Sequence, residues 1–138
     1  MHLKLNVYSD GGARGNPGPA ALAFLFIAEN NEVVKVQSRF LGKRTNNQAE
    51  YEALIAALES AAQFGADEIV CHLDSELVGK HMTGDYKVKN AELRKLWAKA
   101  QELKKCFVRV SFVNVPRNNV YIREADRLVN EKLDDVCL

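Results

Sequence analysis

The sequence predicts an α/β fold with a mixed five-stranded sheet, made of three antiparallel strands and two parallel ones, and with helices on both faces. Five short segments carry alternating or continuous apolar residues, which is typical of strands. Longer segments with apolar residues at helical spacing lie between and after them. The order is βββαβααβα, so short turns join the first three strands, whereas helices lead into the other two.

An antiparallel unit is predicted at the start of the chain. Residues 3–8 alternate between apolar and polar side chains, as a half-buried strand does. We expect a loop over residues 9–19, where glycine and proline are frequent. Residues 20–28 form a buried strand, and after a turn at residues 29–32 the chain returns as a third strand over residues 33–41.

A long helix is predicted after Thr45, which forms a capping box with Gln48. This helix runs to Phe64 and stops at Gly65, a residue that commonly follows a helix end. Residues 68–73 then form a short buried strand.

The next predicted helix is short. It is capped by Asp74 or Ser75 and continues through Met82, and residues 83–89 form a loop.

The last third of the chain predicts a helix, a strand and a final helix. Asn90 caps a helix over residues 91–105, and residues 107–113 form the fifth strand. A loop at residues 116–121 leads into the last helix, over residues 122–135.

Composition indicates an ordinary globular chain of 138 residues, with 47% hydrophobic and 27% charged residues. No linker or repeat divides it, so we expect a single domain over residues 1–138. No apolar run approaches the roughly 18 residues of a membrane span, and no signal peptide is evident. We therefore expect no membrane association.

The three cysteines, Cys71, Cys106 and Cys137, are an odd number and form no C-x-x-C motif. This pattern argues against a zinc site and a disulfide framework. Reduced structural thiols in a cytoplasmic protein are the expectation.

Charge is balanced overall, at +1, but is unevenly distributed. Residues 80–109 contain nine basic and three acidic residues, a net of +6, so the rest of the chain carries −5. A basic region beside an acidic one suits a protein that holds phosphates and binds cations. A solvated, lysine-rich helix would explain the same pattern.

The glycine-rich segment at residues 11–18 has the spacing of neither phosphate-binding glycine motif, and no helix follows it directly. We therefore predict no nucleotide cofactor.

Four acidic residues lie near ends of the predicted elements. Asp10 and Asp74 follow strands that would be neighbours, and Glu50 and Asp126 lie near helix starts. Four converging carboxylates require a cation, and divalent metals with oxygen ligands meet that need. Each acid also has a structural explanation: Asp10 could be a turn residue, Glu50 a capping-box glutamate, Asp74 an N-cap and Asp126 a surface residue.

Four segments resemble, in order and spacing, the motifs of the ribonuclease H type 1 family, in the form that lacks a basic protrusion. The segments are residues 8–20, 45–54, 73–78 and 124–130. The resemblance implies the ribonuclease H-like fold and endonucleolytic hydrolysis of the RNA strand of RNA/DNA hybrids, leaving 3′-hydroxyl and 5′-phosphate ends. It implies that Asp10, Glu50, Asp74 and Asp126 are catalytic and hold two Mg²⁺ or Mn²⁺ ions when substrate is bound. The partner is then an RNA/DNA hybrid duplex, and we expect a monomer.

The resemblance also implies a set of substrate contacts. Amides would face the minor groove and its 2′-hydroxyls, a phosphate of the DNA strand would sit in a pocket, and lysine would add positive charge there. The residues concerned are Gly11, Asn16, Thr45, Asn46, Asn47, Lys89, Asn90 and Asn114. Helix capping alone is the alternative role for Asn46 and Asn47.

Two features depart from the family pattern. Only residues 83–89 stand where many relatives carry a basic helix and loop. Asn114 stands where a histidine is usual, and no histidine follows His81. Two other functions stay open: a non-catalytic module that binds hybrids, and a nuclease of the same fold that prefers double-stranded RNA or DNA.

Overall fold

The computed structural model describes residues 2–136, and its elements follow the predicted order βββαβααβα. The strands are β1 (Lys4–Ala13), β2 (Gly18–Ala28), β3 (Val33–Arg44), β4 (Glu68–Leu73) and β5 (Arg109–Asn114). The helices are α1 (Asn46–Phe64), α2 (Glu76–Thr83), α3 (Ala91–Lys104) and α4 (Val120–Val136).

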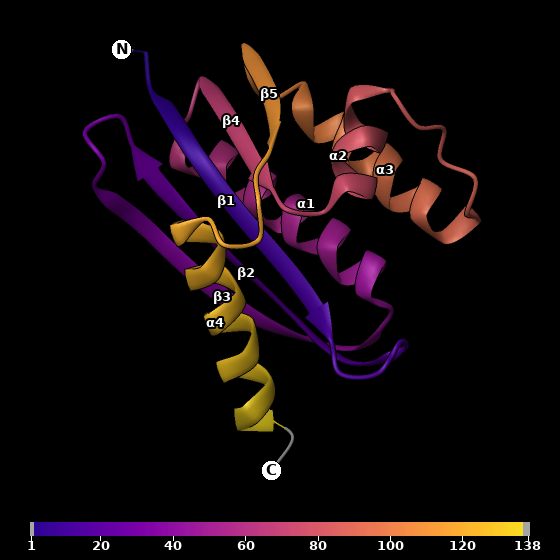
Figure 1. Cartoon of the computed structure of the whole chain (residues 1–138). Helices are drawn as coiled ribbons and strands as arrows, with labels where there is room; N and C mark the ends of the chain where they lie inside the picture. The colour runs from indigo at the N-terminus through magenta and orange to yellow at the C-terminus, as the bar shows by residue number, and fades with distance from the viewer. Residues whose placement is uncertain (1, 137–138) are drawn as a thin grey trace.

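The strands form one mixed sheet in the order β3-β2-β1-β4-β5, with β1 at its centre (Figure 1). β1 pairs antiparallel with β2, and β2 pairs antiparallel with β3. β4 lies parallel to β1 on one side and parallel to β5 on the other. The predicted fold class is therefore confirmed.

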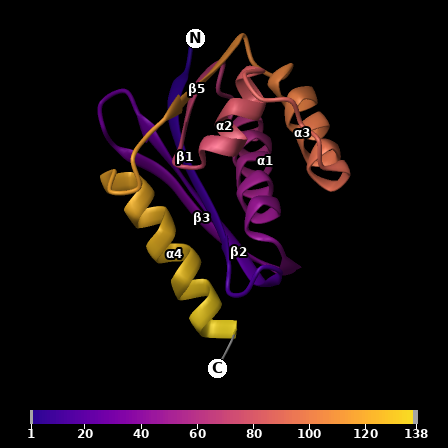
Figure 2. The same cartoon turned by 45° about the vertical axis from the view of Figure 1, so that its right-hand side comes forward.

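Helices cover both faces of the sheet, and the two faces differ in size (Figure 2). The larger core lies under α1, α2 and α3 and includes the fully buried Phe24, Tyr51 and Leu54. The smaller core lies under α4 alone, where Ala125 and Val129 pack against small and branched residues of β2. One helix on a narrow apolar strip therefore forms the whole second layer.

The predicted loop at residues 9–19 is wrong at both ends, because β1 continues through Asp10 to Ala13 and β2 begins at Gly18. Gly11 is required for close packing and not for a turn. A Cβ on Gly11 would lie 2.1 Å from the carbonyl oxygen of Ala49, so α1 could not approach β1 as it does. Asp10 thus lies inside a strand and not at its end.

A short connection joins α2 to α3, and it consists of residues 84–90. This length confirms the form without a basic protrusion. Ser75, and not Asp74, caps α2, because the Ser75 hydroxyl accepts a hydrogen bond from the Val78 amide at 3.2 Å. The Asp74 carboxylate is therefore left for another role.

The two thiols in the described part of the chain differ in their surroundings. Cys71 is buried and Cys106 is exposed, and both are free; Cys137 lies outside the described residues. Over residues 2–136, none of the helices has the length and apolar character needed to cross a bilayer.

Candidate active site

Three of the four predicted acids converge at one end of the sheet. Asp10 comes from β1, Glu50 from α1, and Asp74 directly follows β4. One carboxylate oxygen of each lies within 4.8 Å of the others. Asp10 and Glu50 are only 6% and 8% exposed, so this acidic triad is largely shielded from water.

The register of the sheet explains why Asp10 and Asp74 meet. The parallel pairing of β1 with β4 ends with Tyr8 opposite His72. Each acid is two residues beyond that pair, and side chains two residues apart in a strand point to the same face. The two carboxylates therefore emerge side by side where the strands separate.

Glu50 reaches the same point from the second turn of α1. Its Oε1 accepts a hydrogen bond from the Gly11 amide at 3.2 Å. The missing side chain of Gly11 allows this contact, because it lets the α1 backbone lie against β1. The Gly11 amide thus holds a carboxylate of the triad, and its predicted contact with substrate stays a prediction.

Burial and mutual repulsion disfavour the charged forms of these acids. Burial raises the pKa of Asp10 to about 7, and the negative charges of Asp74 and Asp126 contribute to the rise. Burial also raises the pKa of Glu50 well above its usual value, and the adjacent Asp10 carboxylate adds to that shift. Without a cation, the triad therefore holds a proton near neutral pH.

The triad fits a divalent metal ion. All the donors are hard carboxylate oxygens, which magnesium and manganese prefer. Among the described residues, the buried Asp74 Oδ1 has no hydrogen-bond partner, and a buried acceptor left unpaired is costly. A cation would satisfy that oxygen and remove the repulsion within the triad.

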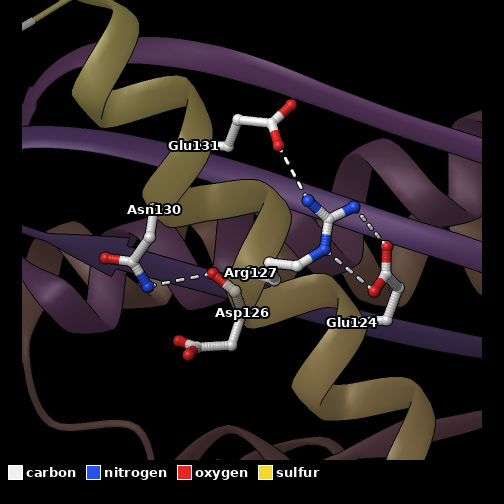
Figure 3. A network of polar contacts seen from close by, with 5 residues as sticks. All are labelled: Glu124, Asp126, Arg127, Asn130 and Glu131. Atoms are coloured by element: carbon white, nitrogen blue, oxygen red, sulfur yellow. Dashed lines mark hydrogen bonds and ion pairs between the residues drawn. The ribbon is translucent and has the colours of Figure 1, made fainter.

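Asp126, the fourth predicted acid, lies apart from the triad on the exposed surface of α4. It is close enough for its charge to raise the pKa of Asp10. Figure 3 shows its carboxylate pointing away from the Arg127 guanidinium, which is bound by Glu124 and Glu131. The Asp126 carbonyl accepts a hydrogen bond from Asn130 Nδ2 at 3.0 Å. Its role as a metal ligand stays a prediction.

Amide side chains lie at the rim of the triad. Asn16 Oδ1 accepts a hydrogen bond from the backbone N–H of Asn46 at 3.0 Å. Asn46 Oδ1 in turn accepts from the backbone N–H of Ala13 at 3.1 Å. Asn47 is exposed and helps to line a hollow of about 270 Å³ beside Glu50 and Asp74. Capping is not the role of Asn46 or Asn47, because Thr45 caps α1 through the predicted capping box.

Thr45 and Asn90 are both helix caps. The Thr45 hydroxyl accepts from the Gln48 amide at 3.1 Å, and Asn90 Oδ1 accepts from the Leu93 amide at 2.9 Å. Their helices begin at the same end of the helical layer in both views (Figures 1 and 2), and Lys89 is exposed beside Asn90. The predicted phosphate pocket formed by these residues stays a prediction.

Asn114 ends β5, and its Nδ2 donates to the carbonyl oxygen of Leu73 at 3.3 Å, next to Asp74.

The rings of His72 and His81 lie away from Asn114 and are held by other contacts. His72 stacks on Tyr8, with 4.2 Å between ring centroids, and its Nε2 lies 3.1 Å from the side-chain oxygen of Asn6. The His81 ring is buried, with Nδ1 2.6 Å from the Tyr51 hydroxyl. Burial lowers the pKa of both imidazoles.

Arg117 is a residue of the site that the sequence analysis missed. Its Nε lies 3.8 Å from Asp74 Oδ2, and its side chain is 86% exposed. Arg117 thus helps to line the hollow beside the triad. The one available signal was a basic residue in the loop after the fifth strand, and a single basic residue in a loop is too common to indicate a site.

Residues 8–132 match the family model described as reverse transcriptase-like. Ribonuclease HI of Halobacterium salinarum is 44% identical over 132 residues, which are 96% of this chain and 65% of that protein. A bifunctional protein of Mycobacterium tuberculosis is 42% identical over 134 residues, or 36% of its length. The chain therefore spans less than two thirds of the length of these curated relatives.

Solved structures agree closely with the fold. The crystal structure of the Halobacterium salinarum ribonuclease H1 superposes with a TM-score of 0.92, covering 96% of this chain and 98% of that one at 44% identity. LC11 ribonuclease H1 in complex with an RNA/DNA hybrid superposes with a TM-score of 0.90 at 41% identity, covering 97% of this chain and 99% of that one.

Proposed function

The chain belongs to the ribonuclease H1 family, and we propose that it hydrolyses the RNA strand of RNA/DNA hybrids internally, leaving 3′-hydroxyl and 5′-phosphate ends. The observation that carries this proposal is the acidic triad, whose three carboxylate oxygens lie within 4.8 Å of one another beside an open hollow. Placing charged carboxylates this close together in a buried site does not stabilise the fold, because burial and mutual repulsion disfavour their charged forms. It suits a metal-dependent phosphodiesterase.

The proposed substrate is supported by the groups around the hollow. Asn46, Asn47 and Arg117 line it together with Glu50 and Asp74. Side-chain amides both donate and accept hydrogen bonds, as reading 2′-hydroxyls and base edges in a shallow minor groove requires. The 2′-hydroxyl distinguishes RNA from DNA, so amides beside the triad favour cleavage of the RNA strand.

In the proposed reaction the protein's own groups hold and orient the scissile phosphate. Asp10, Glu50 and Asp74, with Asp126 from α4, would hold two Mg²⁺ or Mn²⁺ ions when substrate is bound. The ions would supply Lewis-acid stabilisation of the charge on the reacting phosphate. Arg117, which helps to line the hollow, could donate to a phosphate oxygen there, and Asn114 is hydrogen-bonded to the backbone next to Asp74.

Further contacts complete the proposal. Asn16 and Gly11 would contact the minor groove of the hybrid. Thr45, Lys89 and Asn90 would hold a phosphate of the DNA strand.

We further propose that residues 1–138 act as one domain, as a monomer and in the cytoplasm. The free thiols Cys71 and Cys106 support that compartment.

The experiment that tests the proposal compares three labelled duplexes of one sequence: RNA/DNA hybrid, double-stranded RNA and double-stranded DNA. Each is incubated with the protein and Mg²⁺ or Mn²⁺, with the Asp10→Asn variant as the matched control. We expect internal cuts in the RNA strand of the hybrid alone, with 5′-phosphate product ends, and none with the variant.

The other outcomes separate the alternative functions. Binding of the hybrid without cleavage in either metal would indicate a non-catalytic module. Faster cleavage of double-stranded RNA or DNA than of the hybrid would indicate a nuclease of the same fold with another substrate.

A further inference from the structure

The turn between β1 and β2 carries Asn16, and its backbone is tightly held. The Arg14 amide donates to the Pro19 carbonyl at 2.8 Å. A Cβ on Gly18 would lie 2.0 Å from the Arg14 carbonyl oxygen, so the two ends of the turn are in close contact. Gly15 has a φ of +92°, which a side chain would make unfavourable. A displacement of Arg14 would therefore also displace Asn16, two residues away.

The Arg14 side chain extends from this turn to α4. Its Nη2 lies 2.6 Å from Asp134 Oδ1 and donates to the Asn130 carbonyl at 3.2 Å, with Asn130 Oδ1 at 3.5 Å. We call these three residues, Arg14, Asn130 and Asp134, the Arg14 clamp. It joins residues more than 110 positions apart in the sequence.

The clamp continues to the fourth acid. Asn130 Nδ2 donates to the backbone carbonyl of Asp126 at 3.0 Å, as Figure 3 shows. Asn130 therefore contacts Arg14 on one side and the residue that presents the fourth carboxylate on the other. In this part of α4 the packing against the sheet is apolar, through Val129 and Leu133. The Arg14 clamp adds directional polar contacts to this apolar packing.

The same turn is also attached to α1. Asn16 Oδ1 accepts from the Asn46 amide at 3.0 Å, four residues before Glu50. One short turn thus contacts both the helix that supplies Glu50 and the helix that supplies Asp126. Its position suits a group that sets the spacing between those two acids.

The clamp contributes little to stability. Arg14 and Asp134 side chains are 40% and 69% exposed, and exposed ion pairs contribute little to folding. A contact of low energetic value can still matter for rate, because catalysis depends on placing groups within a fraction of an ångström.

We propose that Arg14 is a positioning residue: through Asn130 and Asp134 it fixes α4, and with it the Asp126 carboxylate, relative to the acidic triad. The inference rests on the proposed ribonuclease activity. It assigns Arg14 no contact with the reacting phosphate. Its role is exerted through α4.

The test measures kcat and KM on an RNA/DNA hybrid, together with amide hydrogen exchange in residues 120–136. The variants are Arg14→Ala, Asp134→Ala and the charge swap that combines Arg14→Asp with Asp134→Arg. Arg127→Ala is the matched control, because Arg127 lies on the same helix but, within residues 2–136, its ion pairs are with Glu124 and Glu131 of that helix.

We expect Arg14→Ala and Asp134→Ala each to lower kcat about 5- to 20-fold, with KM within about twofold of wild type. Exchange in α4 should become faster, and the melting temperature should fall by no more than about 4 °C. The charge swap restores the ion pair but not the hydrogen bond to the Asn130 carbonyl, so it should recover part of the lost kcat. Arg127→Ala should leave kcat unchanged.

Three results would overturn the inference. The first is an unchanged kcat in Arg14→Ala. The second is a raised KM with unchanged kcat, which would place the effect on substrate binding, directly or through Asn16. The third is a charge swap without recovery of kcat. A wild-type protein that does not cleave hybrids would instead refute the proposed function. The exchange measurement, which needs no activity, would then decide whether the Arg14 clamp holds α4.

Discussion

Asp10 and Asp126 belong to the same predicted site but stand in opposite physical situations. Asp10 is buried in the central strand, its neighbours are fixed by sheet register, and its pKa is raised to about 7. Asp126 is exposed on a single helix that packs on a narrow apolar strip. The acidic triad is thus built by the core of the fold, whereas the fourth acid is placed by surface contacts.

This contrast separates two ways of making a site. A buried cluster is positioned accurately but must tolerate repulsion, so it lowers the stability of the metal-free protein. An exposed acid causes little such strain but depends on other groups for its placement.

Asp10→Asn should lower kcat on RNA/DNA hybrids by at least about 10³-fold, because it removes a central carboxylate from a site that depends on charge. Asp126→Asn should lower it less, since that acid lies outside the triad. Initial rates with labelled hybrid and Mg²⁺ measure both, and hybrid binding by Asp10→Asn without metal should persist. Residual turnover of Asp10→Asn within tenfold of wild type would contradict the role of Asp10.

Gly11→Ala should lower the free energy of unfolding by about 1–3 kcal/mol or more, because the new Cβ would lie 2.1 Å from the Ala49 carbonyl oxygen. The matched control is Gly79→Ala in α2, where a Cβ meets nothing within 4 Å. That control should be neutral or stabilising by up to about 1 kcal/mol. Urea unfolding of both variants measures the difference, and equal effects would mean that the α1–β1 contact is not tight.

Asp10→Asn should stabilise the metal-free protein at pH 8 by roughly 1–3 kcal/mol, and Asp126→Asn should stabilise it much less. A carboxyl whose pKa is raised on folding binds more protons in the folded state than in the unfolded state. Stability is therefore lost as the pH rises from about 4 through about 7, and the asparagine variant avoids that loss. Thermal unfolding in a chelator at pH 5 and pH 8 measures it. Equal stabilisation at both pH values would show that titration is not the cause.

Asn90→Asp should raise KM about tenfold with little change in kcat, if Asn90 holds a phosphate of the DNA strand. Aspartate caps a helix as well as asparagine does, so α3 keeps its N-cap. The substitution nevertheless removes the amide donor and repels a phosphate. An unchanged KM in the folded variant would place the DNA strand elsewhere.

Asn114→Ala should lower kcat by about 2- to 10-fold, since one hydrogen bond to the Leu73 carbonyl is lost. Asn114→His should raise kcat and add a titration near pH 6.5 that the wild type lacks. The pH profile of kcat measures both effects. A wild-type limb near pH 6.5 that disappears on replacing His72 or His81 would show that one of these imidazoles reaches the phosphate.

Much of the fold follows from the sequence because strand period, helix caps and short turns are local signals. The β1–β4 pairing was also predictable, since a helical crossover brings parallel strands together. The length of β1 was not, because Gly11 and Gly12 are typical of a turn. Only the packing of α1 against β1 shows that Gly11 is required for close approach.

The site was predictable in its residue types but not in its geometry. Glu50 and Asp74 each had a plausible capping role by sequence position alone, and the structure assigns those roles to Gln48 and Ser75. The exposure of Asp126 and the position of Arg117 depend on how a helix and a loop pack, and no local pattern encodes that.

The central position of β1 also bears on the order in which the protein folds. β1, β2 and β3 are neighbours in sequence, so their hairpins close short loops and we expect them to form early. The parallel pairing of β1 with β4 joins residues more than 60 positions apart and must wait for α1 to cross the sheet. The carboxylates therefore come together only late in folding, and metal should slow unfolding far more than it speeds refolding. Stopped-flow refolding and unfolding with and without Mg²⁺ would measure the two effects, and a large acceleration of refolding by Mg²⁺ would contradict this order.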